Sequence, residues 1–166
     1  MRRVYERLLI PAFETGVKRR QTFRYLRELE ASQWRSRAEL EAIQFEALRT
    51  LIAHAFASCP FYREEWQERG LGPDALRTPD DIRRWPLVER ETIRLNRAGM
   101  RSQVPGLRLL AKGTGGSSGT PLQFDLDTRS NEKRMAAAFR GYRWAGAGPG
   151  TRQLYLWGVS PGAGRP

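Results

Sequence analysis

The sequence predicts an α/β protein in which a mostly helical N-terminal region, residues 1–100, is followed by the first strands and helix of an incomplete α/β domain, residues 101–166. Apolar residues recur at helical spacing through most of the first region. In the second, two short strand patterns flank a glycine-rich stretch, and a helical pattern and a third apolar strand follow. The order strand, strand, helix, strand is typical of the start of an α/β domain.

Residues 1–35 form an interrupted helical pattern. Phe23, Leu26 and Leu29 recur at helical spacing, with charged residues opposite. We expect this amphipathic helix to pack on the rest of its domain. The alternative is a helix on a membrane surface, which the four glutamates of the segment disfavour because they repel anionic lipid.

Two helices with clear ends should follow. Ser36 and Glu39 form a capping-box pattern at the start of a long helix. Pro60 suits the first turn of the next helix, and Gly70 should end it in a left-handed conformation. The expected apolar stripe of the long helix is Leu40, Ile43, Ala47, Leu51 and Ala55, with Leu48, Ile52 and Phe56 beside it.

Later signals predict shorter elements. Thr78 and Pro79 begin a short helix that stops before Pro86, and another is expected over residues 89–96. Strands are expected over residues 107–111, 122–126 and 153–157. A helix capped by Asp127 or Thr128 should run to about Trp144, with Met135, Ala138, Phe139 and Tyr142 facing inward.

Composition excludes several classes of protein. The 166 residues carry a net charge of +11, but nearly all the basic residues are arginine, so the charge is weak evidence for nucleic acid. A single cysteine, Cys59, and a single histidine, His54, exclude a disulfide framework and a Cys/His metal cage within one chain. No apolar run is long enough to span a bilayer, and we expect a cytoplasmic protein. Cys59 is expected to be a small buried residue, His54 to have a structural or solvated role, and the five tryptophans to be core or interface anchors.

The most informative segment is Thr114–Pro121, of sequence TGGSSGTP. Its glycines let the backbone approach a ligand closely, and successive N–H groups in such a turn can converge on an anion. Its hydroxyl groups add neutral donors, and Lys112 adds a charge beside it. It is neither a Walker A loop nor a dinucleotide-binding motif, because a strand rather than a helix follows. The alternative is a flexible hairpin or linker.

This loop resembles the phosphate loop of the adenylate-forming (AMP-forming) ligases, in the branch of the phenylacetate–CoA ligases and the capsular polysaccharide biosynthesis (CapK-type) proteins. The resemblance covers about residues 20–158. It includes Pro60-Phe61-Tyr62-Arg63, Trp85-Pro86-Leu87, Tyr142-Arg143-Trp144-Ala145-Gly146 and Leu154-Tyr155-Leu156-Trp157-Gly158. Two positions depart from the family pattern: Thr120 stands where a lysine is common, and Gly115 where a hydroxyl is common.

The resemblance implies that ATP activates a carboxylate to an acyl-adenylate, which passes to coenzyme A or another acceptor. It implies ATP and Mg²⁺ as cofactors and a small carboxylate as substrate, with the loop holding the β- and γ-phosphates. The implied nucleotide-binding residues are Thr114, Gly116, Ser117, Ser118, Gly119 and Thr120. Neither a catalytic residue nor a metal ligand is assigned. In the resembled family the adenine pocket and the lid lie beyond the position of residue 166. The chain is therefore expected to be an N-terminal fragment that is inactive by itself. Truncation, a frameshift and decay of the gene are all left open as its origin.

The alternative is a basic, non-catalytic helical module that binds an anionic membrane surface or a protein partner. In that case Arg2, Arg3, Lys18, Arg19 and Arg20 would control the binding. The acyl substrate, the acceptor and the oligomeric state cannot be read from the sequence.

Overall fold

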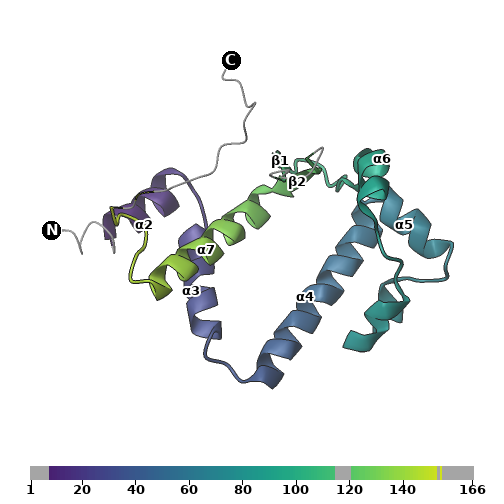
Figure 1. The fold of residues 1–166 in the computed structure, drawn as a ribbon, viewed down its shortest axis with the longest axis horizontal. Coiled ribbons are helices and arrows are strands. Elements are labelled where there is room, and N and C mark those ends of the chain that lie inside the picture. Colours follow the sequence, from purple (N-terminus) through teal and green to yellow (C-terminus); the bar gives the residue numbers. More distant parts are fainter. Residues whose placement is uncertain (1–7, 115–120, 153, 155–166) are drawn as a thin grey trace, which may run out of the picture. The chain divides into compact units, whose positions relative to one another are not determined.

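The computed structural model of the chain describes residues 8–114, 121–152 and 154. This part is mostly helical, with one small two-stranded sheet followed by a helix, which confirms the expected fold class (Figure 1). In chain order the elements are α2 (Ile10–Ala12), the π-helix η2 (Phe13–Val17), α3 (Thr22–Ser32), α4 (Arg37–Ser58), α5 (Pro60–Gln67), the 3-10 helices η3 (Pro73–Ala75) and η4 (Pro79–Arg84), α6 (Arg90–Met100), β1 (Leu109–Gly113), β2 (Gln123–Asp127) and α7 (Thr128–Trp144). Among the described helices, none combines the length and apolar character that a bilayer crossing requires.

The chain divides into two compact units that do not follow its order. One unit contains residues 1–34, 115–119 and 126–166, and the other contains residues 35–114 and 120–125. The boundary expected near residue 100 stays a prediction.

In the first unit, α3 and α7 lie side by side (Figure 1). Phe23 and Leu26 of α3 are buried against Ala136 and Phe139 of α7, and the rings of Phe23 and Phe139 are 6.2 Å apart. The amphipathic helix predicted from Phe23 and Leu26 therefore packs on its own domain.

The buried face of α7 is predicted only in part: Phe139 packs against α3 as expected, but two buried residues of the helix were not predicted. Ala136 is fully buried and Glu132 nearly so, whereas Tyr142 is exposed. The prediction followed the helical spacing of Met135, Ala138, Phe139 and Tyr142. The packing instead centres on Ala136, whose small side chain lets the two helices approach closely.

The second unit has a core of helical residues from α4 and α5 and from the segment that follows them. Trp66 packs edge-on against Trp85, with ring centroids 6.3 Å apart and an interplanar angle of 84°. Such an aromatic pair contributes about 0.5–1.5 kcal/mol beyond the area it buries. The buried members of this core are Ile52, Ala55, Trp66, Leu71, Leu76 and Trp85.

The local signals at the helix ends are confirmed. The Ser36 hydroxyl accepts a hydrogen bond from the Glu39 N–H, and the Glu39 carboxylate accepts one from the Ser36 N–H. Cys59 is the residue before α5, Pro60 is its first residue, and Gly70 has a φ of +65°. Asp127 caps α7 by accepting from the N–H of Ser130.

The apolar stripe of α4 is predicted only in part. Ile52 and Ala55 are buried, and Phe45, Leu48 and Phe56 pack beside them. Leu40, Ile43 and Leu51 are exposed. The core touches one face of this 22-residue helix, so the remaining apolar residues stay on its surface.

The tryptophans, expected to be core or interface anchors, are likewise buried in some places and exposed in others. Trp66 and Trp85 are core residues, whereas Trp34 and Trp144 are exposed. The indole N–H of Trp144 donates to the Gln33 side chain over 3.0 Å, and the guanidinium of Arg140 lies over its ring. Trp157 and the strand expected over residues 153–157 lie outside the described residues.

Candidate functional site

The glycine-rich loop joins two paired strands, β1 and β2, as the sequence predicts. The strands begin one or two residues later than expected, at Leu109 and Gln123. Thr114 and Leu122 close the hairpin. The Thr114 N–H donates to the Leu122 carbonyl, and the Leu122 N–H donates to the Thr114 hydroxyl, each over 3.0 Å. The two ends of the loop are therefore fixed next to each other.

Of the six residues expected to bind nucleotide, the structure describes Thr114. The other five, Gly116, Ser117, Ser118, Gly119 and Thr120, lie outside the described residues. The Thr114 hydroxyl accepts a bond from Leu122, which leaves its own proton to donate to a ligand.

The residues just before the loop suit an anion. Lys112 is exposed on β1, two residues from Thr114. At Gly113 an added Cβ would lie 3.1 Å from the Gln123 side-chain amide, so the Gln123 side chain occupies space that a side chain at residue 113 would need. A compact ammonium and a hydroxyl at the base of a glycine-rich turn suit phosphate oxygens.

The hairpin is tied to α6 by a charged cluster that the sequence does not reveal. The Asp125 side chain, only 6% exposed, forms ion pairs with Arg97 over 2.9 Å and with Arg101 over 3.0 Å. Arg97 donates from Nη2 to Oδ1 and from Nε to Oδ2, which is the forked geometry that makes arginine–carboxylate pairs strong and directional. No local pattern predicts these contacts, because their partners are 24 and 28 residues apart.

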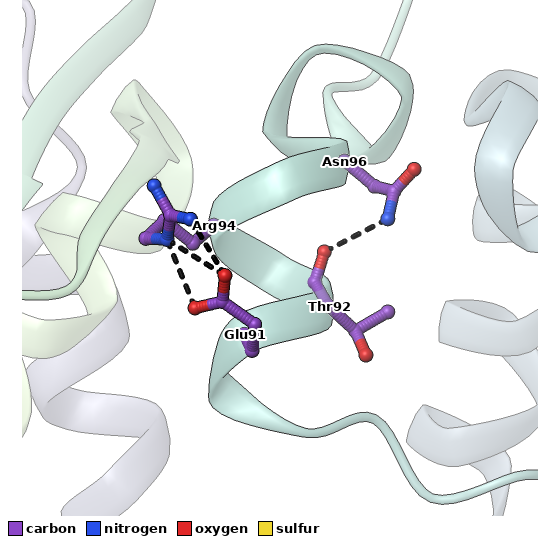
Figure 2. Close-up of polar contacts among 4 residues, drawn as sticks. All are labelled: Glu91, Thr92, Arg94 and Asn96. Atoms are coloured by element: carbon purple, nitrogen blue, oxygen red, sulfur yellow. Dashed lines mark hydrogen bonds and ion pairs between the residues drawn. The ribbon is translucent and has the colours of Figure 1, made fainter.

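Helix α6 carries a second, separate set of polar contacts (Figure 2). Arg94 donates to both oxygens of Glu91, which holds the pKa of that carboxyl below its usual range. The Asn96 side-chain amide donates to the carbonyl of Thr92 over 3.0 Å. The backbone of Asn96 is not helical, with φ −110° and ψ 16°, so α6 bends there. Arg97 is the first residue after this bend.

His54 lies in α4, and Cys59, which directly follows this helix, has the burial expected of it. His54 is exposed on α4. Cys59 is buried, and burial raises the pKa of its thiol, which makes it less reactive. Among the described residues, no three His, Cys, Asp or Glu side chains are grouped to hold a metal ion.

The cations proposed for the membrane-binding alternative are partly neutralised. Lys18 lies 2.9 Å and Arg20 3.1 Å from the Glu14 carboxylate. Burial alone would raise the pKa of Glu14, but the bonds from Lys18 and Arg20 lower it below its usual value. A carboxylate held ionised among these cations opposes attraction to anionic lipid.

The fold and the hairpin thus define a mostly helical protein that holds a glycine- and hydroxyl-rich loop at the end of two antiparallel strands. Its relatives are ligases. Over 117 residues the chain is 28% identical to the phenylacetate-coenzyme A ligase of Escherichia coli (strain K12), covering 67% of this chain and 26% of the relative. Over 138 residues it is 25% identical to the enzyme of the same name from Aromatoleum evansii, covering 81% of this chain and 31% of the relative.

A shorter stretch of 58 residues is 34% identical to the phenylacetate-coenzyme A ligase of Thermus thermophilus, covering 35% of this chain and 13% of the relative. Known protein-family profiles give no match. The chain spans less than a third of the length of each of these relatives. These similarities support a relationship to the adenylate-forming ligases at the level of the family.

Proposed function

We propose that residues 109–127 are the phosphate-binding hairpin of an AMP-forming ligase that activates a carboxylate with ATP. The observation that carries this proposal is the closed base of the loop, where Thr114 and Leu122 exchange two hydrogen bonds. The family-level similarity to phenylacetate-coenzyme A ligases supports it.

Within the loop, Thr114, Ser117, Ser118 and Thr120 donate hydroxyl hydrogens, and Gly116 and Gly119 let the backbone N–H groups approach the β- and γ-phosphates. Donors of this kind stabilise charge as it moves onto the departing pyrophosphate. Bound Mg²⁺ would neutralise phosphate charge. It usually takes most of its ligands from phosphate and water.

The relatives' name gives the substrate class that we propose for the complete enzyme: an arylacetate-like carboxylate, with coenzyme A as acceptor. A CapK-type role in capsular polysaccharide biosynthesis is the second possibility within the same family. Both use the same phosphate loop, so they differ only in the acyl and acceptor pockets.

We further propose that this chain alone binds the triphosphate without turning over. Its relatives are at least three times longer than the part that matches it, and the hairpin offers phosphate contacts but no acyl pocket. Incubation of the purified chain with ATP, Mg²⁺ and a panel of carboxylates should give no pyrophosphate above the level without enzyme. Sustained release of pyrophosphate would refute this second proposal.

Binding itself is tested by thermal shift and calorimetry with Mg-ATP and with inorganic tripolyphosphate. Both ligands should raise the melting temperature. The double substitution Ser117→Ala with Ser118→Ala should abolish the shift, while Ser130→Ala, which removes an exposed hydroxyl from α7, should keep it. If the double variant responds as the parent does, the loop is not the phosphate site.

A further inference from the structure

The Asp125 cluster joins the loop-bearing hairpin to the helical core. Asp125 lies on β2, three residues after Leu122, which closes the loop. Its carboxylate is nearly buried between Arg97, in the last turn of α6, and Arg101, the residue that directly follows the helix. Figure 1 shows the hairpin beside α6.

The last turn of α6 is itself held firmly. A Cβ added at Gly99 would lie 3.3 Å from the Cβ of Phe61, so α6 packs tightly on α5 there. Just after the helix, the Gln103 N–H donates to the Ser58 carbonyl at the end of α4 over 2.8 Å. The end of α6 and the residues just after it, which carry the two arginines, are therefore fixed to the helices of the core.

A two-stranded hairpin has little stability by itself in water, so its orientation must come from what it packs against. Among the described polar contacts between this hairpin and α6, those of Asp125 are the forked, charge-assisted ones, which constrain direction as well as distance. Displacing a binding loop by about 1 Å can cost as much as ~100-fold in activity.

We propose that Asp125, held by Arg97 and Arg101, is a positioning residue that sets the orientation of the β1–β2 hairpin on α6, and so of Thr114 and Leu122 at the base of the phosphate-binding loop. This inference rests on the proposed function. It assigns Asp125 no contact with nucleotide; Asp125 acts through the hairpin. The alternative is that the cluster only adds stability to the fold.

The test compares Mg-ATP affinity and stability in the full chain. Asp125→Asn keeps the shape of the side chain and removes its charge, and the double substitution Arg97→Met with Arg101→Met removes the partners. The double substitution Arg97→Lys with Arg101→Lys keeps the charges and loses the fork. The matched control is Arg94→Met, which breaks the exposed pair with Glu91 on the same helix (Figure 2).

Calorimetry is performed well below the melting temperature of each variant, so that every sample is folded. A positioning role predicts that Asp125→Asn and the methionine pair bind Mg-ATP about tenfold more weakly. It also predicts that the lysine pair recovers part of the loss and that Arg94→Met binds as the parent does. Amide hydrogen exchange should increase in residues 109–114 and 122–127 of the weakened variants, and not in α4.

The outcomes separate the two proposals. If the parent chain binds neither Mg-ATP nor tripolyphosphate, the proposed function fails, and the positioning role fails with it. If the parent binds and the Asp125 and arginine variants bind equally well, the nucleotide site stands and the positioning role is overturned. Lower melting temperatures with unchanged affinity would likewise assign the cluster to stability alone.

Discussion

The carboxylate of Glu132 on α7 accepts a hydrogen bond over 3.0 Å from the backbone N–H of Gln21, the residue that precedes α3. Gln21 has no side-chain cap of its own. The Glu132 carboxylate therefore lies at the positive, N-terminal end of the α3 dipole, although Glu132 and Gln21 are 111 residues apart in the sequence. This contact and the apolar contact of Phe23 and Leu26 hold α3 to α7.

Replacing Glu132 by glutamine should lower the free energy of unfolding by about 1 kcal/mol, because a neutral amide is a weaker partner for the helix end. Urea denaturation measures the change. Glu28→Gln is the control: Glu28 is exposed on α3 and pairs only loosely with Arg24, at 3.4 Å, so its loss should stay within about 0.5 kcal/mol. If the Glu132→Gln protein is more stable than the parent, the free energy of burying the carboxylate exceeds the stabilisation that its hydrogen bond to Gln21 provides.

Stability should fall in acid through the two capping carboxylates, Glu39 and Asp81. Hydrogen bonds from the Ser36 hydroxyl and backbone lower the pKa of Glu39 below its ordinary 4.5. Bonds from the Thr78 backbone and hydroxyl lower the pKa of Asp81 below 3.8. The unfolded chain thus binds protons first as the pH falls, so the stabilisation is complete above these ordinary values and is lost as the pH drops through the folded ones.

The melting temperature of the parent should therefore decrease between pH 5 and pH 3 (about the range that spans the ordinary carboxyl pKa values). The double variant Glu39→Gln with Asp81→Asn should be less stable at pH 6 and should change less across that range. Glu64→Gln with Glu68→Gln, at two exposed positions, serves as the charge-matched control. Equal pH profiles for the parent and the double variant would rule out this role for the caps.

Two leucines should respond in opposite ways to the same truncation. Leu76 is 2% exposed in the core of the second unit, and Leu87 is 96% exposed. Leu76→Ala removes buried methyl groups and leaves a cavity, which should cost about 2–5 kcal/mol. Leu87→Ala should change the free energy of unfolding by less than about 0.5 kcal/mol. Guanidinium titrations compare them directly, and similar losses for both would place Leu76 outside the core.

Replacing two glycines by alanine should change the stability of the protein in opposite directions. Gly70 has a φ of +65°, a conformation that costs an L-residue about 1–2 kcal/mol, so Gly70→Ala should destabilise the chain by that amount. Gly141 lies inside α7, and an added Cβ would meet nothing within 4 Å. Gly141→Ala should therefore stabilise the protein by about 0.5–1 kcal/mol. Thermal melts of both variants measure the difference, and destabilisation by Gly141→Ala would contradict it.

The sequence by itself predicted features that depend on residues only a few positions apart. The Ser36–Glu39 capping box, the start of α5 at Pro60 and the left-handed turn at Gly70 are set by local backbone and side-chain chemistry. The hairpin around the glycine-rich loop was predicted for the same reason, since alternating strands and turn residues are adjacent in the chain.

Only the tertiary structure decided which faces are buried and which charges meet. Periodicity identified α4 and α7 as amphipathic, but the partner helices determined that Leu51 and Tyr142 are exposed and Ala136 is buried. The bonds of Asp125 to Arg97 and Arg101, and of Glu132 to Gln21, join residues 24 to 111 positions apart. Contacts at such separations exist only after packing has brought the elements together, so no local pattern records them.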